Sequence, residues 1–274
     1  MKQAAIIRNA ADPSASGKDF DFVEIASAYL GVTRRVTVWF PPGYRARGRT
    51  LYRALYLNDG QNLFDPRHAF AGVTWGVAET ASWLIRRREI PPIVVVGIDH
   101  GGLRRAREYL PIEDDRNPYA RKPLGREYAK FVVDELKPFI DRTYRVAGGA
   151  RNAAFGGSSY GAVAALYTVL VRPGVFGRLL LESPSLYVGR GYLLQRARAA
   201  RRWPARVYLG VGTMETRRPD WNQQTVADVL KLAAILRKAG LGPARLQVVI
   251  EEGGTHSESA WGSRLPGALK FLFS

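Results

Sequence analysis

The stretch that most constrains the fold is residues 156–161, which read Gly-Gly-Ser-Ser-Tyr-Gly. Residues 151–155 lead into it as a short predicted strand. Residues 162–171 follow as an almost unbroken run of alanine, valine and leucine, which predicts a helix buried against a sheet. A strand, a glycine-lined turn and a helix in this order form the setting of a nucleophile elbow, whose pattern is Gly-x-Ser-x-Gly.

The spacing of the glycines selects the candidate nucleophile. Gly157 and Gly161 flank Ser159 at the required positions, whereas Tyr160 stands where Ser158 would need a glycine. A side chain at either flanking position would crowd a strained turn. Ser159 is therefore the predicted nucleophile, and the alternative is a glycine-rich turn that binds nothing or cradles a phosphate.

The order of elements around this turn predicts one α/β domain. Strand patterns alternate with helix patterns after the first three strands, with no repeat and no linker. We expect a mostly parallel, doubly wound sheet of eight strands over residues 19–274, preceded by a flexible polar lead over residues 1–18. The predicted strands are 20–27, 34–40, 53–57, 93–98, 151–155, 178–181, 206–211 and 245–250, and the main predicted helices are 73–87, 126–144, 162–171, 191–202, 222–239 and 257–273.

Composition excludes several classes of function. The chain has no cysteine, so it cannot use a thiolate nucleophile, a disulfide or a cysteine metal site. No apolar run approaches the length of a membrane span, and the first sixteen residues lack the apolar stretch of a secretory signal. These features predict a cytoplasmic protein without membrane contact.

The formal net charge is +17, and 33 of the 41 basic residues are arginine. Such a charge suggests a nucleic-acid partner. However, the arginines are scattered along the chain and lack the aromatic interleaving of a single-strand platform. An arginine-rich solvated surface that favours anionic substrates is the preferred interpretation.

A nucleophilic serine needs a base, and the chain offers three histidines. His68 and His100 precede the serine, whereas His256 follows the last predicted strand. Only His256 obeys the chain order Ser, acid, His of α/β-hydrolases. Thr255 and Glu258 have the spacing of a capping box, which would place His256 at the start of the final helix.

The acid of such a triad is expected after the penultimate strand, where two carboxylates stand. Glu215 lies directly at the end of that strand and is preferred. Asp220 lies five residues further on, beside Pro219, and could instead cap the following helix. Both remain candidates on sequence alone.

An oxyanion needs two backbone N–H donors. One is expected from Tyr160, which follows the nucleophile, and the other from Gln61 in the turn after the third strand, where Gly60 permits a sharp bend. The alternative is a plain strand-end turn closed by Asp59. No histidine or carboxylate spacing indicates a metal site.

Four segments resemble the esterase D-like "putative esterase" family: residues 55–64, 156–161, 212–215 and 253–261. That family includes enterochelin-type siderophore esterases, feruloyl and acetyl xylan esterases, S-formylglutathione hydrolase and the antigen 85 mycolyltransferases. The resemblance runs from about residue 20 to the end. It implies an α/β-hydrolase fold, a serine ester hydrolase acting through an acyl-enzyme, and no cofactor.

The family's triad falls on Ser159, Glu215 and His256, and its oxyanion donors fall on Gln61 and Tyr160. One departure is glutamate at position 215, where many members carry aspartate, and this leaves the choice between Glu215 and Asp220 open.

The substrate is the least constrained feature. Residues 100–123 and the loop at Trp221 are expected to overhang the site, where Trp221, Tyr119, Arg116 and Arg121 could meet an aromatic or anionic group. Hydrolysis of siderophore lactones or other anionic esters is the first hypothesis. The second is hydrolysis of feruloyl or acetyl esters of plant polysaccharide, and a third is a catalytically silent binding module. A small-molecule ester is the expected partner, and the sequence carries no signal for the oligomeric state.

Overall fold

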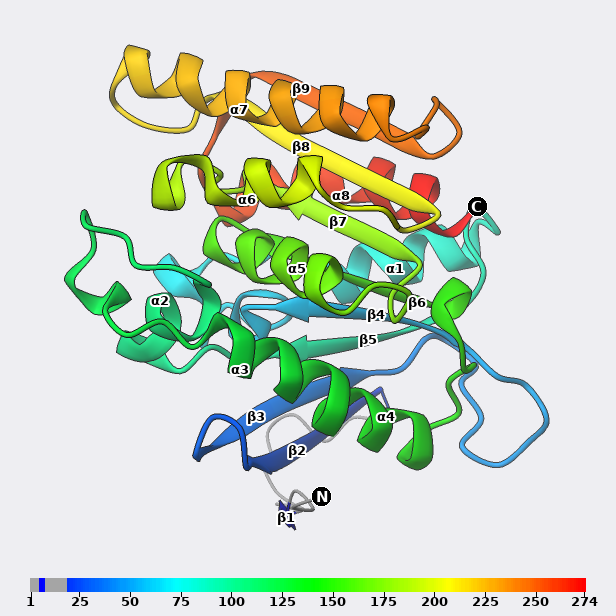
Figure 1. Cartoon of the computed structure of the whole chain (residues 1–274). Coiled ribbons are helices and arrows are strands. Elements are labelled where there is room, and N and C mark those ends of the chain that lie inside the picture. The colour runs from blue at the N-terminus through cyan, green and yellow to red at the C-terminus, as the bar shows by residue number, and fades with distance from the viewer. Residues whose placement is uncertain (1–4, 8–18) are drawn as a thin grey trace.

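The computed structural model describes residues 5–7 and 19–274, which form one mixed sheet with helices on both faces (Figure 1). The strand order is β1-β2-β3-β5-β4-β6-β7-β8-β9. The strands from β5 to β9 in this order run parallel, and β1, β2 and β3 form an antiparallel edge. The strands are β1 Ala5–Ile7, β2 Phe20–Ser27, β3 Val32–Trp39, β4 Arg53–Asn58, β5 Ile93–Ile98, β6 Ala153–Ser158, β7 Arg178–Glu182, β8 Arg206–Met214 and β9 Leu246–Thr255.

All eight predicted strands are present, and the predicted mostly parallel α/β sheet is confirmed. A ninth strand, β1, was not predicted. It falls inside the predicted lead over residues 1–18 and pairs antiparallel with β2. The rest of that lead lies outside the described residues. Three residues are too short for a periodicity to appear in the sequence, and their strand form comes from the β2 edge that they extend.

The helices form two layers (Figure 1). Two of them, α1 and α8, cover one face of the sheet, and the remaining layer covers the other. Apolar side chains from both faces of the strands pack against these layers as two buried clusters. The helices are α1 Val77–Arg86, α2 Arg105–Tyr109, α3 Gly125–Lys130, α4 Lys137–Thr143, α5 Tyr160–Val171, α6 Val188–Arg198, α7 Pro219–Lys238 and α8 Glu258–Phe273. None of the helices in the described part combines the length and apolar character that a membrane span requires.

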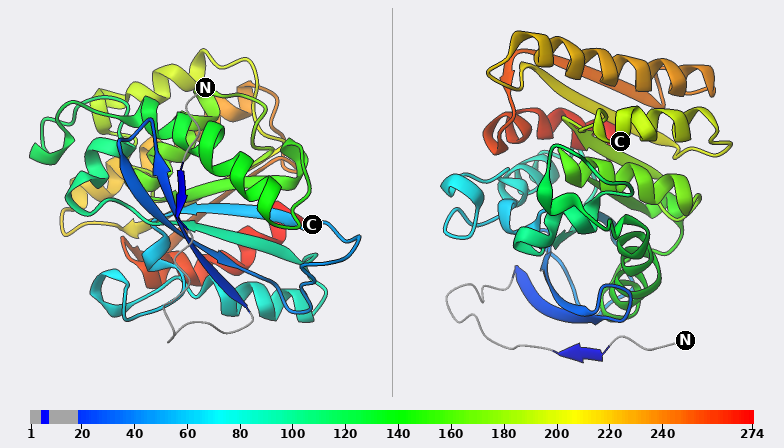
Figure 2. Two further views of the ribbon diagram at one scale, coloured as in Figure 1. Left: turned by 90° about the horizontal axis from the view of Figure 1, so that it is seen from below. Right: turned by 60° about the vertical axis from the view of Figure 1, so that its left-hand side comes forward.

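The main predicted helices are all found, with shifted ends. The amphipathic helix expected over 126–144 is a continuous rod in which Phe131–Leu136, a π-helical segment, joins α3 to α4. The stretch 100–123, expected to overhang the site, contains the short helix α2. Figure 2 shows the twist of the sheet, with β2 and β3 running obliquely to the central parallel strands.

The last turn of α8 is held by arginines from three strands. Arg53 at the start of β4 donates to Phe273 O at 2.8 Å, Arg178 in β7 donates to Leu272 O at 2.5 Å, and Arg206 in β8 donates to Phe271 O at 2.6 Å. These carbonyls have no partner within the helix, so the guanidinium groups satisfy them and complement the negative end of the helix dipole. The end of α8 is thereby fixed to the central sheet.

Candidate active site

Ser159 stands in the turn between β6 and α5. Its backbone has φ 54° and ψ −124°, a region that non-glycine residues rarely occupy. Its N–H donates to Glu182 O at 3.0 Å, which ties the turn to the neighbouring strand β7. Ser158 is buried within β6, whereas Ser159 is only half-buried. Ser159 is thus the serine that the strained turn presents.

The glycines around Ser159 are required by close packing. A Cβ added to Gly157 would lie 3.0 Å from Asn58 Cβ, and one added to Gly161 would lie 2.8 Å from Asp59 Oδ2. Asn58 also donates from Nδ2 to Gly161 O at 2.7 Å. The elbow therefore packs directly against the end of β4, and larger residues would push the two apart.

His256 and Glu215 meet at the ends of β9 and β8. The imidazole Nδ1 lies 2.6 Å from Glu215 Oε2, and the ring packs edge-on to Trp261, with the two centroids 5.0 Å apart. An ionised carboxylate only accepts, so Nδ1–H is the donor and Nε2 is left as the basic nitrogen.

Glu215 is buried and fully occupied by donors. Its Oε1 accepts from Ser183 Oγ at 2.6 Å and from the Gly212 N–H at 2.6 Å. Burial acts to raise the pKa of Glu215, but the hydrogen bond and charge of His256, with the donations from Ser183 and Gly212, outweigh it and hold that pKa below its usual value. The carboxylate therefore stays ionised beside the imidazole.

Two glycines allow the ends of β8 and β9, which lead to Glu215 and His256, to lie close together. A Cβ on Gly212 in β8 would lie 2.0 Å from Gly254 O in β9. The pairing register shifts just beyond, so that Gly212 faces Glu251 while Met214 faces Thr255. This bulge in β9 turns its end toward the acid.

Asp220, the competing acid, lies elsewhere. It is exposed in the first turn of α7 and pairs with Arg218 at 2.7 Å. The expected capping box is also wrong: Thr255 ends β9, and Ser257 caps α8 by accepting from the Ala260 N–H at 3.3 Å. The ladder to Met214 keeps Thr255 extended, which moves the cap two residues along the chain.

The turn after β4 packs tightly against β5. Asp59 rather than Gly60 adopts the left-handed conformation, with φ 61°. Gly60 is needed for a different reason, because a Cβ there would lie 2.6 Å from the Gly97 carbonyl carbon. Gln61 Oε1 accepts from the His100 N–H at 3.1 Å, which holds the turn to the end of β5. Among the described residues, neither the Gln61 nor the Tyr160 backbone N–H has a hydrogen-bond partner.

Arg105, which the sequence analysis did not single out, forms an ion pair with the turn after β4. Its Nε and Nη2 donate to the two carboxylate oxygens of Asp59 at 2.7 and 2.8 Å. The guanidinium also lies 5.3 Å from the Tyr109 ring centroid and 5.7 Å from that of Tyr160. Arg105 was one of many arginines scattered along the chain, and only the folded chain distinguishes it.

A cavity of about 300 Å³ joins these parts, and its lining includes Ser159, His256 and Arg105. Ser159 Oγ lies 3.3 Å from Ser185 Oγ, and no hydrogen bond joins it to His256 in the described structure. His100 lines the same cavity, and burial lowers its pKa. His68 stands apart, about half exposed, 3.9 Å from Asp65.

The predicted substrate residues divide into two groups. The Arg116 guanidinium lies 3.9 Å from the Tyr187 ring centroid and 5.3 Å from that of Trp221, so two of the predicted residues form an aromatic–cation cluster. Tyr119 does not join it and is 54% exposed, while Arg121 pairs with Glu113 at 2.9 Å.

Asp114 connects this cluster to the elbow. Its Oδ2 accepts from Tyr160 Oη at 3.0 Å, and its Oδ1 accepts from Arg116 Nε at 3.0 Å. The stretch 100–123 therefore reaches the residue that follows Ser159. Sequence reasoning placed this stretch near the site but missed Asp114, whose signal was no stronger than that of its acidic neighbours.

The sequence profile of the "Putative esterase" family matches residues 27–272. The ferri-bacillibactin esterase BesA of Bacillus subtilis is 22% identical over 214 residues, which cover 69% of each chain. The siderophore hydrolase EstA of Aspergillus nidulans superposes with a TM-score of 0.71 at 21% identity, covering 96% of each chain. A ferulic acid esterase superposes with a TM-score of 0.69 at 18% identity, covering 99% of this chain and 98% of its own.

The family match spans nearly the whole domain. The two superposed structures share the fold over almost the whole chain. The enzyme hypothesis is therefore confirmed over that of a silent binding module. The chain belongs to the "Putative esterase" family and is a carboxylic ester hydrolase with an α/β-hydrolase fold.

Proposed function

We propose that Ser159, His256 and Glu215 form a catalytic triad that hydrolyses esters through an acyl-enzyme. The observation that carries this proposal is the 2.6 Å contact between His256 Nδ1 and Glu215 Oε2 beside the cavity that Ser159 lines. This contact fixes the tautomer in which Nε2 is the base. The Ser159 hydroxyl turns from Ser185 toward Nε2 when substrate enters.

In this mechanism Ser159 Oγ attacks the ester carbonyl carbon and gives its proton to His256 Nε2. The negative oxygen of the tetrahedral intermediate accepts hydrogen bonds from the Gln61 and Tyr160 N–H groups. When the C–O bond to the leaving alcohol breaks, the imidazolium returns the proton to that alcohol. Water then attacks the acyl carbon while Nε2 takes its proton. The bond from this carbon to Ser159 Oγ breaks, the acid leaves, and the imidazolium returns the proton to Oγ. Glu215 remains a carboxylate throughout and stabilises the imidazolium.

Substitution of the nucleophile tests the mechanism. Ser159→Ala should lower kcat for a 4-nitrophenyl ester roughly a million-fold, because the triad acts as a unit. Mass spectrometry of the wild-type protein quenched during turnover should show the added acyl group, and the variant should show none. Undiminished turnover in pure Ser159→Ala protein would refute the triad.

For the substrate we propose siderophore lactones or other anionic esters. Arg105 lines the serine cavity, and Arg116 lies over the Tyr187 ring in the cluster that Asp114 links to Tyr160. The relatives named as siderophore hydrolases support the same class. The second candidate is a feruloyl ester, favoured by the half-buried rings of Tyr187 and Trp221, whose centroids lie 5.8 Å apart.

Salt dependence separates the two substrate classes. The Debye length falls from about 30 Å at 0.01 M salt to about 8 Å at 0.15 M. If arginines draw in an anionic substrate, kcat/KM for a ferric catecholate lactone should fall over this range while kcat stays constant. Methyl ferulate, which is uncharged, is the control and should give a flat profile. Parallel profiles would remove charge steering and leave +17 as a surface property.

A further inference from the structure

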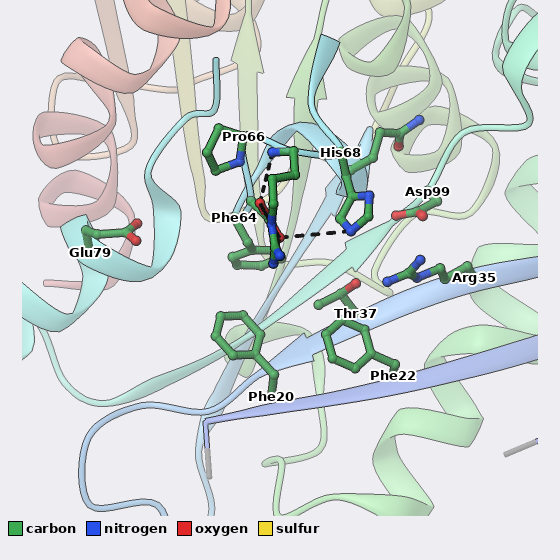
Figure 3. Close-up of a pocket in the computed structure, with 13 residues that line it drawn as sticks. Phe20, Phe22, Arg35, Thr37, Phe64, Pro66, His68, Glu79 and Asp99 are labelled. Atoms are coloured by element: carbon green, nitrogen blue, oxygen red, sulfur yellow. Dashed lines mark hydrogen bonds and ion pairs between the residues drawn. The ribbon is translucent and has the colours of Figure 1, made fainter. Parts of the chain in front are cut away.

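A second cavity lies behind the turn that follows β4. Its volume is about 470 Å³, and its walls come from β2, β3, the end of β5 and the segment 64–68 (Figure 3). It is distinct from the serine cavity, since no residue of the proposed triad lines it. Nothing described so far gives it a role.

The two cavities share a wall. In the turn after β4, Asp59 and Asn62 face the serine cavity, whereas Gly60 and Gln61 face the second cavity. The end of β5 divides in the same way: His100 lines the first cavity, and its neighbour Asp99 lines the second. An occupant of the second cavity would therefore touch the back of the predicted oxyanion turn.

One wall of the second cavity is aromatic. Phe20 and Phe22 lie side by side on β2 (Figure 3), with centroids 6.3 Å apart and ring planes within 9° of each other. Phe64 meets Phe20 edge to face at 5.5 Å. Such faces suit a flat ring, which can stack on one phenylalanine and present its edge to another.

The wall beside these rings is polar. Asp99 lines this wall, and its Oδ1 is buried against Gly60 without a hydrogen-bond partner among the described residues. An unmade hydrogen bond of this kind is costly. Burial raises the pKa of Asp99 to about 6, although Arg35 and Arg34 act to lower it. At neutral pH the carboxyl is therefore mainly an ionised acceptor.

Arg35 lines the same wall, with its guanidinium 5.1 Å from the Phe22 ring centroid. It attracts Asp99 electrostatically, yet no ion pair joins the two in the described structure. A group placed between them must donate to the carboxylate and accept from the guanidinium. A hydroxyl does both, whereas a carboxylate would repel Asp99 and an ammonium would repel Arg35.

We propose that this cavity is a binding site for a small phenol, whose ring packs on Phe20, Phe22 and Phe64 while its hydroxyl bridges Asp99 and Arg35. The site goes beyond the proposed hydrolysis and does not depend on it, because none of these residues takes part in the triad.

Isothermal titration of phenol into the wild-type protein and into Ser159→Ala tests the site directly. Both proteins should bind phenol saturably with the same affinity. Benzoate, benzylamine and cyclohexanol serve as matched ligands that lack the neutral hydroxyl or the aromatic face, and each should bind at least tenfold more weakly.

Two variants locate the binding. Asp99→Asn should weaken phenol about tenfold by removing the charged acceptor, and Phe22→Leu should weaken it by removing the stacking face. Asp141→Asn, an exposed carboxylate of α4 that does not line the cavity, should bind as the wild type does. If Asp99→Asn fails to fold, the phenol affinity of Phe22→Leu alone shows whether phenol binds in this cavity.

The absence of saturable phenol binding to the wild type would overturn the proposal, as would binding that these cavity variants leave unchanged. Binding lost in Ser159→Ala would overturn it too, because the ligand would then sit in the serine cavity. None of these results bears on the triad, which turnover tests separately.

Discussion

Two buried glutamates stand at the ends of neighbouring strands and are held in opposite ways. Glu215, after β8, accepts from a serine hydroxyl and a backbone N–H in addition to the imidazole. Glu182, the last residue of β7, receives both of its hydrogen bonds from Arg264 on a single oxygen, Oε2, at 2.9 and 2.7 Å. Its Oε1 has no partner among the described residues.

Their pKa values move in opposite directions. The pKa of Glu215 is lowered, whereas burial raises that of Glu182 to about 7 despite the charge of Arg264. The difference agrees with the expectation that a neighbouring cation does not always offset the cost of burying a carboxylate. Glu215 has donors on both oxygens as well as the charge of His256, and these favour its ionised form.

The largest effect is expected from Glu215→Gln. The amide can donate to His256 and so favour the wrong tautomer, and kcat should fall on the order of ten-thousand-fold. Asp220→Asn is the matched control and should leave kcat nearly unchanged, because Asp220 is an exposed partner of Arg218. Steady-state kinetics on both variants measures the two values of kcat. A larger loss of kcat in Asp220→Asn than in Glu215→Gln would assign the triad acid to Asp220.

Glu182→Gln should change stability rather than catalysis. The folded pKa of Glu182, about 7, lies above its ordinary value of 4.5, so the folded state binds the proton more tightly. Its contribution to stability is therefore complete below about pH 4.5 and is lost as the pH rises through 7. The free energy of unfolding of the wild type should therefore fall by about 3 kcal/mol over this pH range. Glu182→Gln has no carboxyl at this position and should not show this decrease.

Urea unfolding at pH 5 and pH 8 measures this difference. The free energy of unfolding should fall less between the two pH values in Glu182→Gln than in the wild type. Glu252→Gln, an exposed glutamate of β9, should follow the wild type. Equal slopes in all three proteins would show that Glu182 is ionised when folded and would remove the contrast with Glu215.

The smallest effect is expected from Ser183→Ala. Ser183 Oγ donates to Glu215 and accepts from Trp261 Nε1 at 2.9 Å. Removing one of three donors to the carboxylate should lower kcat roughly tenfold with KM unchanged. Ser263→Ala is the control, because Ser263 donates instead to Glu251. An unaltered kcat would mean that the remaining donors suffice to hold Glu215.

For the candidate site, the sequence supports predictions that follow from order along the chain. Ser159 came from the spacing of its glycines and His256 from its position after the last strand. Order could not separate Glu215 from Asp220, since both follow β8 and only the fold directs one of them toward the imidazole.

Contacts between segments that lie far apart in the chain could not be predicted from local sequence patterns. Ser183 lies 32 residues from Glu215, and Arg105 lies 46 residues from Asp59. Each is a common residue type in an unremarkable context, and its partner is chosen by strand order. The strand β1 was missed for a similar reason, since it exists through its pairing with β2.

The arginine clamp on the last turn of α8 has a consequence for the order of folding. Arg53 and Phe273 are 220 positions apart, so their contact closes one of the longest loops in the chain and carries a high entropic penalty. We expect α8 to dock only after the central strands have paired. His256 lies two residues before this helix, and its contact with Glu215 forms when the helix arrives. During refolding, ester hydrolysis should therefore recover later than sheet structure measured by circular dichroism.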